Sequence, residues 1–320
     1  MKTFVDELMN EIRKKQSILC VGLDPQLKYI PTHILEEGYR QARHPFEFEP
    51  IARAFVIYFE EIIKTVAPYV VVTKPQMAFY EHYGHWGVWA FEKVVQACRE
   101  SDLLVIEDAK RCDGGDTAVA YAEGHLGTVD VWDPRKQEFV KEFSIFNIDA
   151  MTVVPWIGSS CLTPFIELVK RNGKGIFVVD KTSFKPNSEI EQLVTTSGRK
   201  VWEETALLVK KWSEGCEGQC GLNNVGVVLG ATFPEEAEIM AKLLPNCFKL
   251  VPGYGAQLGP ADDAVKGWPC IVSSSRDIDY AYQRKFKCDP TEFPEAARRE
   301  AEFSRDDLNQ ALKRANKIPW

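Results

Sequence analysis

Several features of membrane, secreted and nucleic-acid-binding proteins are missing from this 320-residue sequence. No apolar run approaches the roughly 18 residues of a membrane span. No Asn-x-Ser/Thr sequon occurs, and the start, Met1 to Lys15, is charged and helical in pattern, without the apolar core of a secretory leader. A broad basic surface is missing as well, because 39 Lys+Arg stand against 46 Asp+Glu and the formal charge is −7. We therefore expect a cytoplasmic protein that binds neither membranes nor nucleic acids.

The nine cysteines form no disulfide or metal framework that the sequence can define. Their number is odd and they are scattered through apolar segments, which is typical of reduced, buried thiols. Cys216 and Cys220 form a Cys-x3-Cys pair without a nearby histidine, so a zinc site would need ligands from elsewhere. His82 and His85 lie in a Tyr/Gly-rich loop and lack the glutamate of a metalloprotease helix. The sequence therefore predicts no metal site.

Eight short apolar runs recur along the chain, and amphipathic helical stretches separate them. Several runs are nearly continuous in Val, Ile and Leu, as in parallel strands that are buried on both faces. Eight alternating strand–helix units predict an α/β fold, a (β/α)8 TIM barrel, in a single domain over residues 1–320. The predicted strands are Ile18–Leu23, Tyr69–Thr73, Leu103–Glu107, Ala150–Val154, Gly175–Val179, Val225–Leu229, Phe248–Val251 and Cys270–Ser273.

A doubly wound open sheet is the main alternative to the barrel. It would normally carry a Gly-rich fingerprint after the first strand, whereas here that strand runs into Gly22-Leu23-Asp24-Pro25. Around the barrel we expect an N-terminal helix, an insertion near 129–148 and a helical C-terminal tail from Asp277 to Trp320. A turn at Asp133-Pro134 suggests that the insertion is a surface hairpin. Ser304 is predicted to cap the last helix.

Charged residues follow the first three predicted strands, at the end where such barrels place their chemistry. Asp24 follows the first strand, Lys74 follows the second, and the third ends in Asp108, Lys110 and Asp113. Asp108 and Lys110 are two apart, so in a regular strand both side chains point to one face. Carboxylates on either side keep a lysine protonated, since opposite charges about 4 Å apart gain about 4 kcal/mol at an effective dielectric near 20. Such an ammonium can protonate a carbanion, while a structural ion-pair network is the alternative.

The last two predicted strands end in residues suited to an anion. Gly253 and Gly255 let backbone amides approach a ligand, and Gln257 adds a donor. Arg276 supplies a bidentate guanidinium at the end of the next strand. Because barrels commonly hold phosphate in the loops after strands seven and eight, we predict a phosphate site here.

At these positions the sequence resembles the orotidine 5′-phosphate decarboxylase family, in particular its longer subgroup, from about Phe4 to Lys313. The Asp-x-Lys-x-x-Asp motif alone is shared with related sugar-phosphate lyases. Its combination with Lys-Thr-Ser and Pro-Gly-x-Gly-Ala-Gln is much more specific. The matching segments are VGLDP (Val21–Pro25), KPQMAFYE (Lys74–Glu81), DAKRCDGGDTAVAYA (Asp108–Ala122), DKTSFKPNS (Asp180–Ser188), VVLGAT (Val227–Thr232), PGYGAQ (Pro252–Gln257) and SSSR (Ser273–Arg276).

The resemblance implies a cofactor-free, homodimeric decarboxylase that converts orotidine 5′-phosphate into uridine 5′-phosphate, the last step of pyrimidine synthesis. The implied catalytic residues are Lys110 as proton donor to C6, Asp108 beside the substrate carboxylate, Lys74 between the ribose and the charged array, and Asp113 from the neighbouring subunit. The implied substrate-binding residues are Asp24 at the ribose hydroxyls, Thr117 from the neighbouring subunit, Ser183 at the pyrimidine edge, Pro252 on the ring, Gln257 and Arg276 at the phosphate, and Ser275.

Three positions depart from the family pattern, and none of them removes a charged catalytic residue. Gly114 replaces a usually apolar residue and leaves less apolar wall near the departing carboxylate, Gln76 replaces a common Asn, and Val154-Pro155-Trp156 replaces Asn-Pro-Tyr. Three other functions stay open from the residues alone. They are a metal-dependent sugar-phosphate lyase, an aldolase with an imine on Lys181 or Lys110, and a nucleotide-binding module without turnover.

Overall fold

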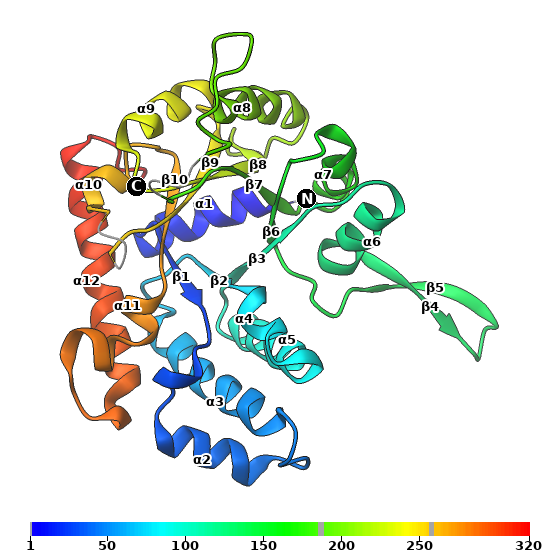
Figure 1. Cartoon of the computed structure of the whole chain (residues 1–320), viewed down its shortest axis with the longest axis vertical. Helices are drawn as coiled ribbons and strands as arrows, with labels where there is room; N and C mark the ends of the chain where they lie inside the picture. The colour runs from blue at the N-terminus through cyan, green and yellow to red at the C-terminus, as the bar shows by residue number, and fades with distance from the viewer. Residues whose placement is uncertain (1, 185–188, 256–258) are drawn as a thin grey trace.

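Eight parallel strands close into a barrel in the computed structural model, which describes residues 2–184, 189–255 and 259–320 (Figure 1). The order around the barrel is β1-β10-β9-β8-β7-β6-β3-β2, and β1 pairs with both β2 and β10. This closure confirms the predicted TIM barrel and excludes the open sheet. The strands are β1 (Leu19–Leu23), β2 (Val72–Pro75), β3 (Leu104–Arg111), β6 (Ala150–Val153), β7 (Gly175–Lys181), β8 (Asn223–Leu229), β9 (Cys247–Pro252) and β10 (Cys270–Ser274).

Helices cover the outside of the barrel because each presents apolar residues at helical spacing to the strands. In α3, for example, Phe55, Phe59 and Ile62 are fully buried. None of the described helices is long and apolar enough to cross a membrane. The helices are α1 (Phe4–Lys15), α2 (Thr32–Gln41), α3 (Glu49–Val66), α4 (Met77–Glu81), α5 (Gly84–Glu100), α6 (Gly115–Leu126), α7 (Ser159–Asn172), α8 (Val201–Trp212), α9 (Pro234–Leu243), α10 (Ala261–Ala264), α11 (Arg276–Asp279) and α12 (Phe293–Arg314).

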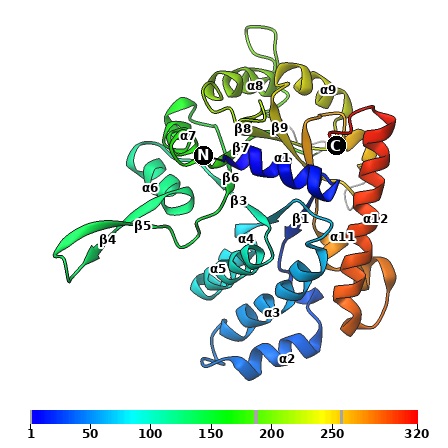
Figure 2. The same cartoon turned by 180° about the vertical axis from the view of Figure 1, so that it is seen from behind.

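Helix α1 lies across the amino-terminal ends of the strands (Figure 2). Its Phe4 ring meets Phe177 of β7 edge-on, with 6.1 Å between ring centroids. A Cβ at Gly175 would come within 2.4 Å of the Phe4 ring, so this close approach requires glycine at the start of β7. The Val5 amide donates to the side-chain oxygen of Asn224 in β8 at 2.9 Å. With this end covered, a ligand has to enter at the carboxyl ends of the strands.

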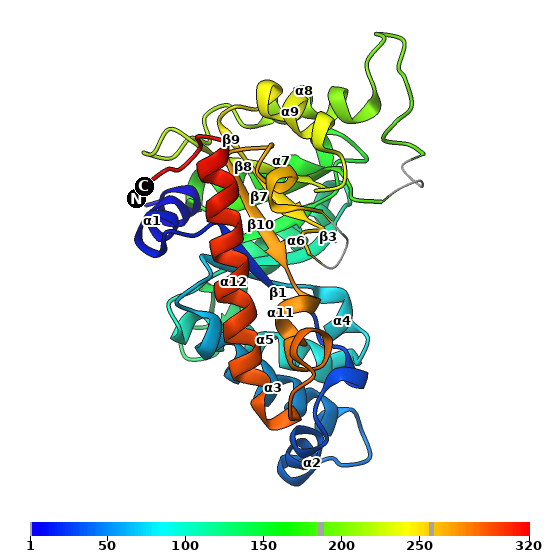
Figure 3. The ribbon, with the colours of Figure 1, turned by 90° about the vertical axis from the view of Figure 1, so that its left-hand side faces the viewer.

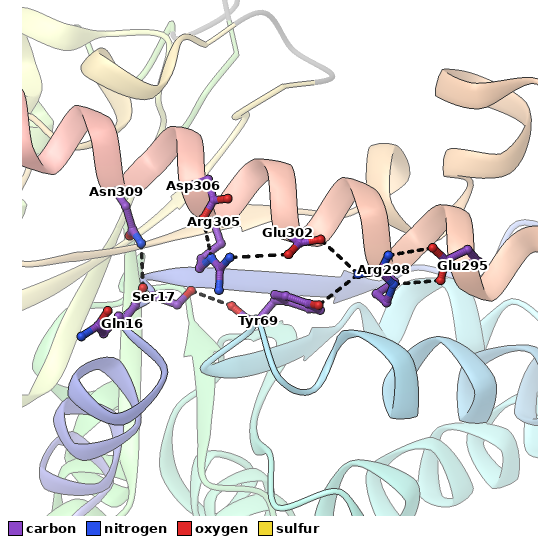
Figure 4. Close-up of polar contacts among 9 residues, drawn as sticks. All are labelled: Gln16, Ser17, Tyr69, Glu295, Arg298, Glu302, Arg305, Asp306 and Asn309. Atoms are coloured by element: carbon purple, nitrogen blue, oxygen red, sulfur yellow. Dashed lines mark hydrogen bonds and ion pairs between the residues drawn. The ribbon is translucent and has the colours of Figure 1, made fainter.

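Helix α12 runs along the side of the barrel and is hydrogen-bonded to the segments that precede β1 and β2 (Figures 3 and 4). Arg298 donates to the Tyr69 hydroxyl at 3.1 Å, and Asn309 donates to the Gln16 carbonyl oxygen at 2.8 Å. These contacts join the C-terminal tail to segments more than 200 residues earlier in the chain.

The prediction that Ser304 caps the last helix is wrong. Ser304 lies in the middle of α12, is 1% exposed and shares the buried face with Ala301 and Leu308. The acidic residues that follow Ser304 resemble the first turn of a helix, but the apolar spacing continues through it. The helix instead begins at Phe293 with Pro294 in its first turn, where a missing backbone N–H costs little.

Two antiparallel strands, β4 (Thr128–Asp133) and β5 (Glu138–Phe143), form a hairpin that projects away from the barrel (Figure 1). Trp132 and Phe139 face each other across the strands with ring centroids 5.3 Å apart. The hairpin lengthens the connection between β3 and β6 without changing the strand order.

Lys249 of β9 is a fully buried lysine outside the cavity of the barrel. Its ammonium donates to the Leu244 carbonyl oxygen at the end of α9, at 2.6 Å, and it forms no ion pair with the described residues. Burial lowers the pKa of Lys249 from 10.5 to about 8, while nearby Cys247 and Cys270 oppose the shift and Lys317 adds to it. The unfolded chain therefore binds more protons than the folded chain between these two pH values, and stability rises with pH across this window.

We predict that Lys249→Met raises the free energy of unfolding at pH 7, by at most about 3 kcal/mol, because methionine removes the buried charge. The gain should shrink as the pH rises from 8 toward 10.5, where the folded wild type has already lost this proton. Urea unfolding of both proteins across this pH range measures the difference. Lys242→Met on α9 is the matched control, because Lys242 is exposed. A gain that stays constant from pH 7 to 10 would contradict the assigned cause.

Candidate active site

A cavity of about 220 Å³ opens at the carboxyl ends of the strands. The ends of β1, β2, β3 and β10 contribute charged and polar side chains, and β7, β8 and β9 contribute the apolar ones, with Thr182 and Ser183 after β7 as further polar residues. The lining residues are Asp24, Lys74, Gln76, Asp108, Lys110, Val179, Thr182, Ser183, Phe184, Val228, Leu250, Pro252, Gly253, Tyr254, Ser273, Ser275 and Arg276.

The end of β3 is bulged, which differs from the regular strand assumed in the sequence analysis. Between Glu107 and Arg111 its pairing with β6 shifts register, and Lys110 has a φ of 49°, in the left-handed region. A bulge of this kind bends a strand and re-aims its side chains. The Lys110 ammonium still contacts the Asp108 carboxylate, but it does so from a bulged backbone and not from a regular strand.

Asp108 is the centre of the polar side of the cavity, and four side chains donate to it. Lys74 and Gln76 donate to Oδ2 at 2.9 and 3.0 Å. Lys110 and Thr152 donate to Oδ1 at 2.5 and 2.8 Å. Since both oxygens have two donors, the carboxylate is fixed in orientation as well as in charge.

The two lysines hold Asp108 ionised. Burial alone would raise the pKa of Asp108, but the ammonium charges and hydrogen bonds of Lys74 and Lys110 bring it well below its ordinary value. Burial likewise disfavours the Lys74 ammonium, yet Asp108 and Asp24 raise its pKa above the ordinary value. The Lys74 side chain is only 6% exposed, whereas that of Lys110 is 43% exposed. Lys110 is therefore the lysine whose ammonium is open to a ligand.

Asp24 follows β1 and offers an acceptor to the cavity. Its Oδ1 is buried and has no hydrogen-bond partner among the described residues. Burial raises the pKa of Asp24, and the charge of Asp108 adds to this, while Lys74 opposes it. A ligand hydroxyl at this oxygen would supply the missing donor.

The loop that carries Asp24 is fixed by the segment after β10. The Tyr280 hydroxyl donates to the Asp24 carbonyl oxygen at 2.7 Å and accepts from the Gln26 amide at 2.8 Å. A Cβ at Gly22 would lie 1.8 Å from the Ser275 hydroxyl oxygen, so the two strand ends approach this closely only with glycine there.

The predicted phosphate side is built from the ends of β9 and β10. Gly253 and Gly255 have φ values of 102° and 73°, a backbone shape that favours glycine. Arg276 is the first residue of α11 and lines the cavity. Its guanidinium forms no ion pair with any residue in the described ranges 2–184, 189–255 and 259–320. Gln257 lies outside the described residues. An unpaired guanidinium beside glycine amides is suited to a phosphate dianion.

Ser183 and Pro252 line the cavity, whereas Lys181 does not. Lys181 is fully buried and pairs with Glu191 at 2.7 Å and Glu236 at 3.8 Å, away from the cavity. An imine on Lys181 would require breaking this network, so the aldolase alternative on Lys181 has no support from the geometry.

The donor set of the cavity is poorly suited to a metal ion. The lysines already neutralise Asp108, and their charges would repel a divalent cation. Within the described parts of the chain, no group of three or more His, Cys, Asp or Glu is arranged to hold a metal. All nine cysteines are free thiols, Cys216 and Cys220 included.

Asp113 and Thr117 lie outside the lining of this cavity. Asp113 accepts from the Gly114 amide at 2.7 Å, and Thr117 is exposed on α6. Gly114 is also outside the lining, and a Cβ there would meet nothing within 4 Å. The role of Asp113 and Thr117 at the site of a neighbouring subunit stays a prediction.

Sequence reasoning missed Thr152 and the apolar lining. Thr152 is the single polar residue in the run Ala150–Val154, and it is fully buried. A lone hydroxyl inside a buried strand needs a partner, which is the signal that could have identified it. The apolar lining residues, such as Val179, Val228 and Leu250, carry no signal that separates them from the core.

Comparisons with known proteins agree on one family. The model of the "Orotidine 5'-phosphate decarboxylase / HUMPS family" matches residues 17–273. The chain is 35% identical to orotidine 5′-phosphate decarboxylase of Rhodopirellula baltica, over 89% of this chain and 91% of the relative, and 32% identical to that of Caldicellulosiruptor saccharolyticus, over 98% and 100%. Among solved structures, Leishmania donovani OMP decarboxylase superposes with a TM-score of 0.70 at 25% identity, covering 97% of this chain and 98% of the other.

Arg276 forms no ion pair with the residues that the structure describes, and this leads to a prediction about anions. Inorganic phosphate should raise the melting temperature of the wild type, because a ligand at tenfold its Kd stabilises the folded state by about 1.4 kcal/mol. Arg276→Ala should abolish this effect. Thermal denaturation with increasing phosphate measures it, at constant ionic strength set with chloride. Arg135→Ala is the control, since that side chain is 89% exposed on the hairpin. Equal stabilisation of Arg276→Ala would place the anion site elsewhere.

Proposed function

The chain belongs to the orotidine 5′-phosphate decarboxylase family, and from this premise we propose how its cavity performs the reaction. The protein is a carboxy-lyase of pyrimidine biosynthesis, which converts orotidine 5′-phosphate into uridine 5′-phosphate and carbon dioxide. The observation that carries the proposal is the Lys110 ammonium, held 2.5 Å from the Asp108 carboxylate and open to the cavity.

The substrate lies along the cavity with its phosphate at Arg276 and its charged base near Lys110. Ser275 and Gly253 line the same cavity as Arg276. Gln257, outside the described residues, is proposed as a further phosphate donor. The phosphate is far from the bond that breaks, so its binding energy serves to order the site and not to change the reacting atoms.

The ribose and the base take the middle of the cavity. The Asp24 carboxylate, which lines the cavity, accepts from a ribose hydroxyl, and Lys74, whose charge Asp24 and Asp108 balance, also contacts the ribose. The pyrimidine ring packs on Pro252, with Ser183 at its edge. Thr232 donates to the Ser183 carbonyl oxygen at 3.0 Å and so fixes that edge.

The chemical step breaks the bond between C6 and the carboxylate carbon. Carbon dioxide leaves without the electron pair, which stays on C6 as a localised carbanion. A proton of the Lys110 ammonium then forms the new C–H bond, and solvent returns a proton to the lysine. The ammonium is already held in place by Asp108, so it stabilises the developing charge without reorganisation.

Asp108 contributes through its charge as well as through position. It stays ionised, with its pKa held low by the two lysines, so it faces the substrate carboxylate as a second negative charge. The repulsion exists in the bound substrate and disappears when carbon dioxide departs. It therefore favours the transition state over the bound substrate.

A second copy of the chain completes the site in this proposal. Asp113 lies between β3 and α6, Thr117 lies in the first turn of α6, and neither lines the cavity of its own chain. We assign them to the ribose and charged cluster of the partner in a homodimer, as the resemblance implies.

The reaction itself provides the first test. Absorbance should report loss of orotidine 5′-phosphate at the same rate with and without EDTA. Lys110→Ala should lower kcat by more than about 100-fold, because it removes both the proton donor and the cation beside C6. Lys14→Ala is the control, on a side chain that is 69% exposed. Activity of Lys110→Ala within tenfold of the wild type would contradict the assigned donor.

Mixed dimers test the contribution of the second subunit. Lys110→Ala and Asp113→Ala should each be nearly inactive alone. After joint unfolding and refolding, about one quarter of the sites would combine an intact Lys110 with an intact Asp113 from the partner, if subunits pair at random. The mixture should recover activity in that proportion. No recovery, with dimers present by light scattering, would mean that each site uses its own Asp113.

A further inference from the structure

Thr152 closes a gap that the bulge of β3 opens in the barrel. Beyond Glu107, paired with Met151, the ladder between β3 and β6 resumes only at Arg111, which pairs with Val153. Lys110 lies within this stretch of shifted register. Its backbone amide donates to the Thr152 hydroxyl oxygen at 3.0 Å.

The same hydroxyl donates its own proton to Asp108. The distance from Thr152 Oγ1 to Asp108 Oδ1 is 2.8 Å, and this is the oxygen that also accepts from the Lys110 ammonium. The Thr152 hydroxyl thus links the backbone of Lys110 to the carboxylate that holds the side chain of Lys110. The three groups form a closed ring of hydrogen bonds, in which the lysine is fixed at both its ends.

We propose that Thr152 is a positioning residue for the proton donor, an inference that rests on the proposed decarboxylase function. Thr152 is fully buried and does not line the cavity, so it touches no ligand and acts only through Lys110 and Asp108. Its backbone is anchored independently, because it pairs with Phe177 of β7. The hydroxyl is therefore attached to the rigid part of the barrel, while the bulged end of β3 is the part that it orients.

The backbone of Lys110 explains why a hydroxyl is needed at this place. A φ of 49° is unfavourable for a lysine, and such conformations persist only where the surroundings hold them. Without the hydroxyl, the Lys110 amide would lose its acceptor and Asp108 Oδ1 would lose one of two donors. The bulge could then relax, and the ammonium would move relative to C6 while the rest of the cavity stayed in place.

Two substitutions separate the hydroxyl from the shape of the side chain. Thr152→Val keeps the branched shape and removes the hydroxyl, whereas Thr152→Ser keeps the hydroxyl and removes the methyl group. We expect Thr152→Val to lower kcat by about 10- to 100-fold, since small misplacements of a reacting group have effects of this size. Thr152→Ser should recover most of kcat. KM and inhibition by uridine 5′-phosphate should change by less than about threefold in both, because the ligand contacts remain.

Steady-state kinetics on the whole chain measure kcat and KM of each Thr152 variant and so test its positioning role. Circular dichroism and thermal melting show that each variant is folded. Thr152→Ala replaces the valine variant if the latter does not fold. A valine variant with kcat within threefold of the wild type would overturn the role of Thr152, as would a serine variant that is as slow as valine, or a loss confined to KM. A wild-type protein without decarboxylase activity would instead overturn the proposed function itself.

Discussion

The arrangement of the site depends on one buried carboxylate. Asp108 lies at the end of a barrel strand, where an ionised group is stable only if its charge and its lone pairs are both compensated. Three strands and the residue after one of them supply that compensation: Lys74 lies in β2 and Gln76 follows it, Lys110 lies in β3, and Thr152 lies in β6. Removing any one donor leaves a charge that the remaining ones compensate less well. This mutual requirement is why the cluster is at once a folding constraint and a prepared electrostatic environment for the reaction.

The two lysines of the cluster have similar partners but different surroundings. Lys74 is enclosed, and its charge mainly balances Asp24 and Asp108. Lys110 reaches the same carboxylate with a side chain that is much more exposed, and its ammonium is the proposed proton donor. A proton that is transferred in each cycle must be replaced from solvent, and only the more exposed position allows this. The difference in burial therefore supports the proposed division, with a structural role for Lys74 and a chemical role for Lys110.

The barrel was predictable because buried parallel strands appear in the sequence as continuous apolar runs. The charged residues at the ends of β1, β2 and β3 were predictable because they directly follow such runs. Local irregularity was not predictable in the same way. The alternation rule places Asp108 and Lys110 on one face of a regular strand, but their contact depends on a bulge and on a φ of 49°. Thr152 meets Asp108 across 44 residues of chain, and nothing within either segment announces that contact. Ser304 shows the opposite error, since a local cap signal was overridden by packing along α12.

The short segment after β10 has a consequence for selectivity. Arg276 opens α11, and Tyr280, which directly follows that helix, holds the loop of Asp24 through its hydroxyl. Arg276 and Tyr280 are thus a little more than one helical turn apart, so one short segment holds both the proposed phosphate contact and the loop of the proposed ribose contact. This arrangement would fix the distance between the two proposed ligand contacts. If the proposed contacts hold, a nucleoside without a phosphate would reach only the ribose contact, and a diphosphate would not match both contacts, so the site would select for a monophosphate.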